Sequence, residues 1–394
     1  NGETSYTSVD TIPSDLTNYY IDEENTFCEN GGKVSIVGNK LAYQTLGSDR
    51  CSVYLYYEEL HDIKINVANP SYLLGGYTKS MTNCDGITGG TWDYKINGII
   101  IDNISKTNSS CNITFTPKTP TTLELLSTVV NNKATRNENG KRYQGKNPNN
   151  YIWFNNEYWR IIGVFDSASH GVSGKNLVKI IRADVLDGLA WHKSNTNDWT
   201  ASSLKSLLNG AYYNAQDGTS SGYCYGYGIT ATANCDYTKR GIQSGYRGMI
   251  ANVTWHLGGY SSSSATAEAF YGYERGTTVY SGRPTSTTGY IGLMYPSDYG
   301  YSVLSSSCAR TTNLGSYNSA KCAGQSWLYG KGYEWTLTHN SSNSNSVFNL
   351  YNDGYVFDSY PHSGHGSRPV LYLDASVYKI GGDGSLNNPY IVGM

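Results

Sequence analysis

Aromatic and short polar side chains alternate in one segment near the end of the chain. The residues concerned are Tyr351, Asn352, Asp353, Tyr355, Phe357, Asp358, Ser359, Tyr360, His362, Ser363 and His365. Tyrosine gives a large contact area at low entropic cost, and short polar residues supply adaptable hydrogen bonds. This composition predicts a ligand-binding surface within residues 351–367. The alternative is a β-hairpin whose aromatic residues pack across the strands around an Asp353-Gly354 turn. We expect both, with a structural turn and an exposed binding face.

Two histidines in this segment raise the possibility of a metal site. His362 and His365 stand three residues apart and could ligate a metal together with Asp358. Gly364 and Gly366 disfavour the helix that would place the two imidazoles on one face. We therefore expect exposed contact histidines and no metal.

Catalytic and calcium-binding motifs are absent from the sequence. No serine-hydrolase elbow, zinc-peptidase or phosphate-binding loop motif occurs. Asp298 and Asp383 stand in turn contexts and leave calcium as a smaller possibility, but EF-hand spacing is missing. We expect no cofactor and no enzymatic activity.

The cysteines are spaced as local pairs. We expect disulfides within the pairs Cys28 and Cys51, Cys84 and Cys111, Cys224 and Cys235, and Cys308 and Cys322. The sequence contains no CxxC motif, and no histidine lies at zinc-ligand spacing from these cysteines. We therefore do not expect the cysteines to bind a metal. Paired cysteines are typical of oxidising compartments, so an extracellular or cell-surface location is expected.

Composition excludes other classes of partner. The 394 residues contain 29 Lys and Arg against 31 Asp and Glu, a net charge of −2. A nucleic-acid binder would be expected to carry a basic surface. No apolar run is long enough for a transmembrane helix.

Element patterns predict several units. In residues 1–120, the segments after Cys51 and Cys111 alternate apolar residues with period two, which predicts one or two small β modules. Residues 121–150 are interpreted as a short helix over 123–130 and a polar linker. A second domain over 151–394 opens with a predicted hairpin over 151–164, a strand over 177–182 and a helix over 199–209. Residues 210–289 are dominated by loops.

From Tyr151 onward the chain resembles C-type-lectin-like, formylglycine-generating-enzyme-like domains of bacterial surface proteins. The matching motifs are Tyr158-Trp159-Arg160-Ile161-Ile162, Asp198-Trp199, residues 290–299, Trp335-Thr336-Leu337-Thr338, Ser367-Arg368-Pro369-Val370-Leu371-Tyr372-Leu373 and Asn388-Pro389-Tyr390. The resemblance implies an α+β fold, closed by strands from the domain's two ends and preceded by disulfide-linked all-β (Ig-like) modules. It also implies a scaffold for binding loops, as in the variable proteins of diversity-generating retroelements.

Residues 347–366 suit such a variable segment. Mutagenesis of adenines in Asn codons yields Tyr, Asp, Phe, Ser, His and Asn, which dominate this stretch, whereas Lys, Glu, Gln, Met and Trp are absent. We expect Tyr223, Tyr225 and Tyr227 to contribute to the same surface.

The leading hypothesis is an exported adhesin or receptor-type protein that binds a protein or glycan on another cell. A pilin-like or surface-filament subunit is the alternative. A formylglycine-generating oxidoreductase would need reactive thiols, and no cysteine follows Cys322. We expect framework roles for Trp159, Arg160, Trp335, Arg368 and Tyr372, with Arg368 paired to a carboxylate such as Asp184 or Asp374.

Overall fold

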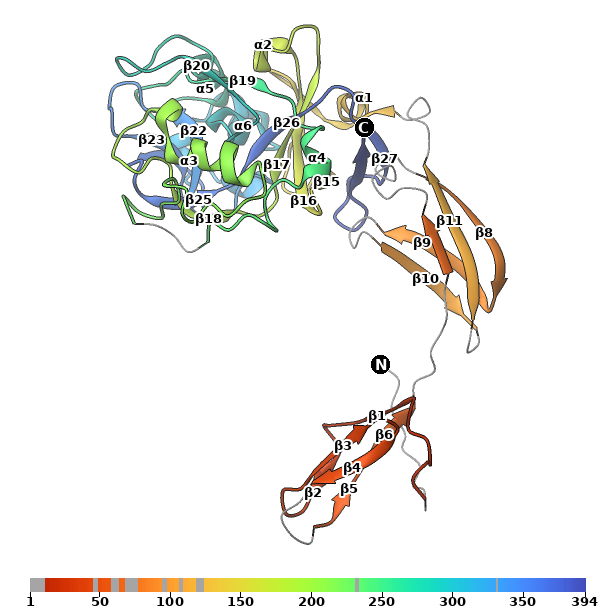
Figure 1. The fold of residues 1–394 in the computed structure, drawn as a ribbon. Helices are drawn as coiled ribbons and strands as arrows, with labels where there is room; N and C mark the ends of the chain where they lie inside the picture. Colours follow the sequence, from red (N-terminus) through yellow and green to blue (C-terminus); the bar gives the residue numbers. More distant parts are fainter. Residues whose placement is uncertain are drawn as a thin grey trace. The chain divides into compact units, whose positions relative to one another are not determined.

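The computed structural model describes residues 11–44, 49–57, 64–67, 77–93, 98–105, 109–117, 124–230, 234–330 and 332–394 (Figure 1). The described fold is mixed α+β and dominated by strands. Two compact units divide the chain. The first comprises Asn1–Val67, Lys79–Asp93 and Ile99–Phe115, and the second contains Thr116–Met394 with two short preceding segments.

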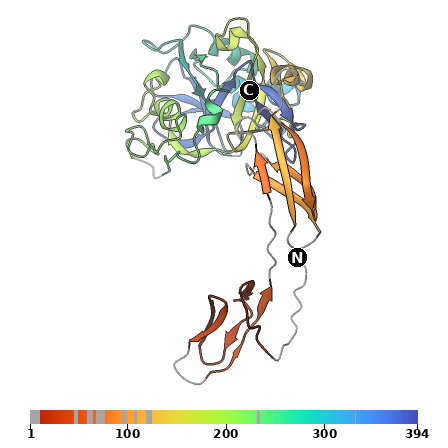
Figure 2. The same ribbon diagram turned by 45° about the vertical axis from the view of Figure 1, so that its right-hand side comes forward.

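The first unit is built from small sheets. Its strands are β1 (Tyr19–Ile21), β2 (Phe27–Cys28), β3 (Lys33–Val37), β4 (Lys40–Gln44), β5 (Cys51–Ser52), β6 (Leu55–Tyr57), β7 (Lys64–Val67), β8 (Tyr77–Asp85), β9 (Ile87–Asp93), β10 (Gly98–Ile104) and β11 (Ser110–Pro117). Strands β1 and β6, β2 and β5, β3 and β4, and β9 and β10 form pairs, and β7, β11 and β8 form a three-stranded sheet. Figure 2 shows the strands of this unit in a turned view, coloured from red to orange along the sequence. The disulfides Cys28–Cys51 and Cys84–Cys111 confirm the two predicted pairings here.

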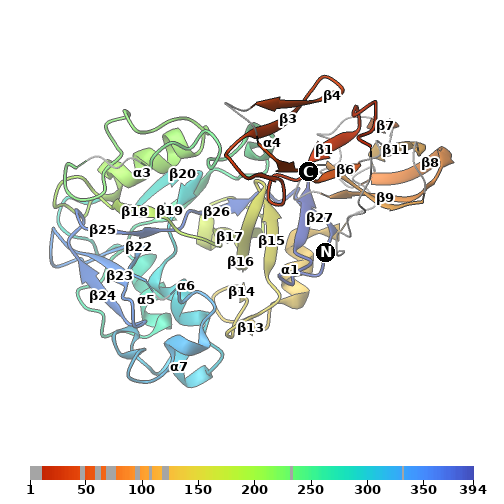
Figure 3. The same cartoon turned by 90° about the horizontal axis from the view of Figure 1, so that it is seen from below.

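A large sheet forms the base of the second unit. Its order is β12 (Glu124–Leu125), β27 (Tyr378–Gly381), β28 (Tyr390–Gly393), β15 (Tyr151–Phe154), β16 (Glu157–Phe165), β17 (Leu177–Arg182), β26 (Val370–Leu373) and β21 (Ile291–Gly292). Strand β14 (Lys141–Arg142) pairs with both β16 and β13 (Arg136–Asn137). The predicted hairpin over 151–164 and the strand over 177–182 are confirmed. Because β28 lies parallel to β15, the C-terminal strand closes against the start of the 151–394 region (Figure 3).

A second sheet carries the segment singled out in the sequence. Its order is β18 (Leu186–Ala190), β25 (Gly364–Ser367), β22 (Glu334–His339), β23 (Val347–Leu350) and β24 (Val356–Ser359). A separate hairpin joins β19 (Val253–His256) to β20 (Ser286–Gly289). The disulfides Cys224–Cys235 and Cys308–Cys322 confirm the remaining pairings and close two loops of this unit.

The helices of the second unit are short. They are α1 (Leu126–Lys133), α2 (Ser167–His170), α3 (Ser203–Leu207), α4 (Ser244–Arg247), α5 (Ala267–Glu274), α6 (Pro296–Tyr301) and α7 (Ser306–Arg310). The helix predicted over 199–209 is instead three consecutive pieces, a 3₁₀ turn (Trp199–Ala201), α3 and a π turn (Leu208–Tyr212). Ser202 caps α3, since its hydroxyl accepts a hydrogen bond from the Lys205 N–H at 3.2 Å.

Three local expectations need correction. The helix expected over 123–130 begins at Leu126, because Glu124 and Leu125 pair with β27 as a strand. Residues 131–150, expected to be an exposed linker, contribute β13 and β14, and Arg142 is buried there. Arg368 pairs with Glu334, at 2.6 Å between Nε and Oε1, rather than with Asp184 or Asp374. The expected framework residues, including Arg368, are all buried.

Buried His339 makes the stability of this unit depend on pH. Burial, reinforced by the Arg283 cation, lowers the pKa of His339 to about 4. The unfolded chain, with an ordinary histidine pKa, therefore binds more protons below about pH 6.5. Neutral, buried His339 therefore contributes its full share of the free energy of unfolding above about pH 6.5, and this share is lost as the pH falls toward 4. Between pH 7 and pH 5 the free energy of unfolding should fall by about 2 kcal/mol for this reason. Urea unfolding at pH 7 and pH 5 should show that the free energy of unfolding changes less with pH in His339→Gln than in the parent chain. An equal change in both proteins would contradict the role given to His339.

Within the described residues, no helix is both long and apolar enough to cross a lipid bilayer. Four disulfides join all eight cysteines. Such a set is typical of proteins that fold in an oxidising, extracytoplasmic compartment.

Candidate ligand-binding surface

The hairpin of β23 and β24 places the predicted segment at a tight turn. Residues Tyr351 and Tyr355 close it, with the Tyr351 N–H donating to the Tyr355 carbonyl at 2.9 Å. Gly354 adopts a φ of 93°, a conformation that L side chains rarely adopt, and its N–H donates to the Tyr351 carbonyl. The predicted Asp353-Gly354 turn is therefore confirmed as a structural feature.

Side chains from neighbouring segments hold this turn from outside the hairpin. The buried Tyr299 hydroxyl donates to the Gly354 carbonyl at 2.6 Å, and the Tyr329 hydroxyl donates to the Asn352 carbonyl at 2.7 Å. The amide of Asn318 donates to the Asp353 carboxylate at 2.9 Å. Asn352 and Asp353 are exposed, but these bonds fix their backbone, so the turn is pre-organised.

Five aromatic rings gather beside the turn, and we call Tyr333, Tyr351, Tyr355, Phe357 and His365 the turn cluster. Tyr351 lies 4.7 Å from Tyr355, 4.9 Å from Tyr333 and 5.9 Å from Phe357, measured between ring centroids. Tyr333 stacks on His365 at 5.2 Å. Phe357 is 46% exposed and Tyr333 is 42% exposed. The cluster therefore presents aromatic surface to solvent beside strands β22 and β23, which are buried along their whole length.

A second group combines Tyr360 and His362, on the segment that connects β24 to β25, with Tyr227 of the loop closed by Cys224–Cys235. We call these three residues the loop cluster. Tyr360 stacks on His362 at 5.7 Å, and the Tyr227 ring meets His362 edge-on at 5.2 Å. Tyr360 is 56% exposed and Tyr227 is 62% exposed. The Gly228 N–H donates to the His362 carbonyl at 2.8 Å, so the loop closed by Cys224–Cys235 packs directly on the predicted segment.

The remaining predicted residues are polar and lie in different surroundings. Asn352 and Asp353 belong to the turn beside the turn cluster. In the β23–β24 register Phe357 faces Asn349 whereas Asp358 faces Phe348, so the two side chains point to opposite faces of the sheet. Asp358 accepts a hydrogen bond from the Asn340 amide at 3.2 Å. Ser359 and Ser363 are half-buried. The structure thus groups the aromatic residues into two clusters, whereas the polar residues are divided among the turn, β24 and the segment before β25.

This arrangement does not assemble the metal site considered in the sequence. Among the described residues, Asp358, His362 and His365 do not bring their ligand atoms together. Burial lowers the pKa of His365, whose Nε2 has no hydrogen-bond partner. The imidazole is therefore neutral at neutral pH. His362 and His365 are both half-buried, which corrects the expectation that these histidines are exposed.

The acidic residues considered for calcium have structural partners. Asp298 is buried between two cations. The carboxylate of Asp383 accepts the Ser385 N–H at 2.9 Å within a turn. Both carboxylates therefore have partners within the protein.

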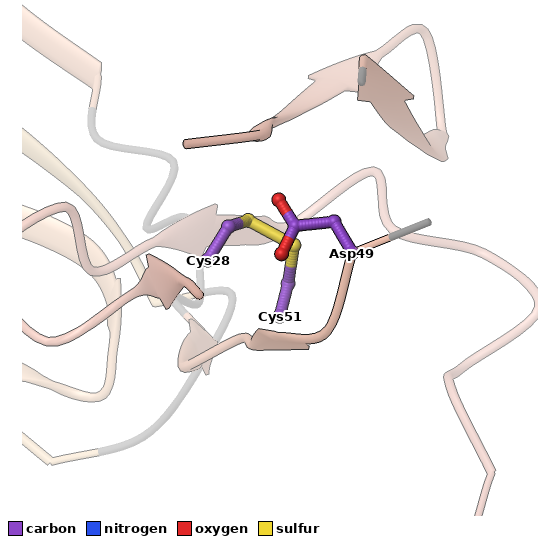
Figure 4. Close-up of side chains that lie close together, drawn as sticks. All are labelled: Cys28, Asp49 and Cys51. Atoms are coloured by element: carbon purple, nitrogen blue, oxygen red, sulfur yellow. A yellow bond between two sulfur atoms is a disulfide. The ribbon is translucent and has the colours of Figure 1, made fainter. Parts of the chain in front are cut away.

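One group of potential ligand atoms does come together, in the first unit. Figure 4 shows the Cys28–Cys51 disulfide beside the Asp49 carboxylate. Both sulfurs are in the disulfide, and Asp49 accepts the Asn30 and Gly32 N–H groups at 2.8 and 2.7 Å. Oxidised sulfur is not a thiolate ligand, so this group organises a loop and is not a metal centre. The other six cysteines are also in disulfides.

Sequence reasoning missed two parts of this surface. Tyr333 joins the turn cluster because β22 and β25 pair in parallel, with Glu334 opposite Gly366. Ile229, 81% exposed, extends the apolar surface of the loop that carries Tyr227. In the sequence, the tyrosine-rich stretch around Cys224 is the feature that indicates that this loop belongs to the surface. Comparisons of the chain with protein-family models, with curated proteins and with solved structures found no match.

Proposed function

We propose that the second unit is the binding domain of an exported, surface-displayed protein. The turn cluster and the loop cluster would contact a protein or glycan on another cell. The single observation that carries the proposal is the exposure of Tyr227, Tyr333, Phe357 and Tyr360, four large aromatic residues, around one segment. Exposed aromatic residues in such numbers mark interaction surfaces, and Tyr is enriched among the residues that dominate binding energy.

Anchoring of the backbone supports a binding role. The turn beneath the turn cluster is fixed by the hydroxyls of Tyr299 and Tyr329, and the loop of Tyr227 is closed by a disulfide. Contact residues on an ordered backbone lose less conformational entropy when a ligand binds. A C-type-lectin-like scaffold with a variable 351–367 segment would use this arrangement, with side chains exchanged on a constant hairpin.

Loss of exposed aromatic rings should weaken binding without unfolding the protein. The purified chain would be screened against glycan arrays and cell-surface protein arrays. We expect Phe357→Ala and Tyr360→Ala each to weaken a detected interaction by about tenfold or more. Tyr43→Ala is the matched control, because Tyr43 is 47% exposed but belongs to the first unit.

The outcomes separate the competing interpretations. Thermal unfolding should be unchanged in all three variants, since the residues are exposed. A ligand that binds both surface variants as tightly as the parent chain would place the site elsewhere. A complete absence of ligands would favour the filament-subunit alternative, which self-association of the chain would test.

A further inference from the structure

Two tyrosine rings of the second unit lie face to face, outside both the turn cluster and the loop cluster. The rings of Tyr260 and Tyr273 are parallel to within 3°, and their centroids are 3.9 Å apart. Aromatic pairs usually prefer offset or edge-to-face arrangements, with centroids about 4.5–7 Å apart. The two rings are therefore closer together than packing preference alone predicts.

Backbone contacts fix both residues in this arrangement. Tyr273 lies in the last turn of α5, and Tyr260 follows a segment that contacts the end of that helix. The Gly258 N–H donates to the Glu274 carbonyl at 2.9 Å, and a Cβ added at Gly258 would lie 2.1 Å from the Tyr273 carbonyl oxygen. The Tyr260 carbonyl accepts the Ser341 N–H at 2.9 Å. The fold itself thus holds the two rings against each other.

The two phenol groups point the same way. The hydroxyl of Tyr260 is the main cause that raises the pKa of Tyr273, so the two hydroxyls lie side by side. In parallel rings with adjacent hydroxyls, the neighbouring Cε atoms also face each other. These are ring carbons that carry unpaired electron density in a tyrosyl radical, in an orbital perpendicular to the ring. Both side chains are half-buried, so a small oxidant can reach the pair from solvent.

We propose that Tyr260 and Tyr273 are a modification site, at which hydrogen peroxide and a haem peroxidase form an intramolecular dityrosine cross-link. The enzyme removes one electron and the phenolic proton from each tyrosine, and one hydrogen peroxide is reduced to two water molecules. The two radicals then pair to form one Cε–Cε bond. The hydrogen atom on each bonded Cε moves to the phenol oxygen, which restores both aromatic rings. The product is lighter than the parent chain by two hydrogen atoms.

The surroundings of the pair favour this reaction. The four disulfides are typical of proteins that fold in an oxidising compartment, with which such an oxidant is compatible. The two radicals would form in contact, and groups held in position react at effective concentrations far above those of separate molecules. The bond would join α5 to the segment that bridges to Asn340, directly after β22. The site does not depend on the function proposed for the aromatic clusters.

Oxidation of the whole chain by a haem peroxidase and hydrogen peroxide tests the proposal. The protein is kept dilute so that coupling within one chain outpaces coupling between chains. We expect a monomer that is lighter by two hydrogen atoms and shows dityrosine fluorescence. After reduction of the disulfides, cleavage at basic residues and glutamates should release two cross-linked peptides, residues 248–268 with Tyr260 and residues 269–274 with Tyr273.

Removal of single hydroxyl groups locates the bond. Tyr260→Phe and Tyr273→Phe should each lower the yield of this product at least tenfold, because phenylalanine forms no phenoxyl radical. Both variants keep the ring, so thermal unfolding before oxidation should match that of the parent chain. Tyr271→Phe is the matched control and should keep the full yield. Tyr271 lies in the same short peptide as Tyr273, but its ring packs on the Arg275 guanidinium at 3.5 Å.

A tilted pair tests the role of stacking. Tyr19 and Tyr57 lie 5.1 Å apart with an angle of 57° between their rings, and Tyr57 is 54% exposed. This accessible pair should give at least tenfold less cross-linked product than the stacked pair. An oxidised parent chain without intramolecular dityrosine, a full yield in Tyr260→Phe, or a loss of product in Tyr271→Phe would overturn the proposal. An equal yield at Tyr19 and Tyr57 would also overturn it, since accessibility alone would then decide where the bond forms.

Discussion

Replacing Asp298 by Ala should lower the free energy of unfolding by about 3–5 kcal/mol, the cost of removing one partner from a buried ionic group. Asp298 is 2% exposed and lies between Arg142 and Lys179, with N–O distances of 2.8 and 2.5 Å. Burial alone would raise the pKa of Asp298, but the two cations hold it well below its usual range. The variant would leave both cations buried without their shared anion.

The position of Asp298 in α6 adds to this cost. Its Oδ2 accepts the Tyr295 N–H at 3.0 Å and so caps the helix that begins at Pro296. Arg142 comes from β14 and Lys179 from β17, so the carboxylate joins the helix to the large sheet. One side chain thereby connects three elements that are distant in sequence.

A double-mutant cycle isolates the ionic contribution of Asp298 to the free energy of unfolding. Burial lowers the pKa of Lys179 to about 8 even with Asp298 beside it, so Lys179→Met removes a charge that is already costly to bury. We expect Asp298→Ala to destabilise less in the Lys179→Met background, by about 1 kcal/mol or more, because fewer unpaired cations remain. Chemical denaturation of the four proteins measures this. Additive changes would show that the Asp298–Lys179 ion pair contributes nothing and that Asp298 acts through Arg142 and the helix cap.

Features that depend on neighbours in sequence could be predicted. Local cysteine pairs gave all four disulfides, and period-two patterns gave the hairpin of β15 and β16. The turn at Gly354 followed from the Asp-Gly pair, which tolerates a positive φ. In each case the sequence signal and the structural feature involve nearby residues.

Features that depend on partners distant in sequence could not be predicted. Arg142 stands in a polar stretch that reads as a linker, and its partner Asp298 is 156 residues away. Tyr333 reaches the turn cluster through the parallel pairing of β22 with β25, which no local pattern indicates. Asp358 was grouped with His362 and His365 by proximity in sequence, but strand alternation turns it to the other face. Composition alone singled out residues 351–367. Which face of the sheet each of these residues occupies depends on strand pairing, which composition does not reveal.

Gly354→Ala should destabilise the protein by about 2–4 kcal/mol, from backbone strain and a steric clash together. The added Cβ would lie 2.2 Å from the Ala323 Cβ and 3.2 Å from the Tyr299 hydroxyl, at a φ of 93°. Neither neighbour is a flexible side-chain end, so the turn would have to move. That movement would break the Tyr299 bond and shift Tyr351 and Tyr355, so weaker ligand binding should accompany the loss of stability.

Exchanging the two small residues tests the steric cause. Ala323→Gly removes the methyl group that a Gly354→Ala Cβ would meet, so the double variant should regain about 1–2 kcal/mol relative to Gly354→Ala alone. Full recovery is not expected, because the positive φ still disfavours alanine. Gly324→Ala is the adjacent control, since no atom lies within 4 Å of the added Cβ. Thermal and urea unfolding of these variants measure how rigid the turn is. A Gly354→Ala protein as stable as Gly324→Ala would show that the turn adapts freely. In that case it would not be the rigid support inferred for the aromatic surface.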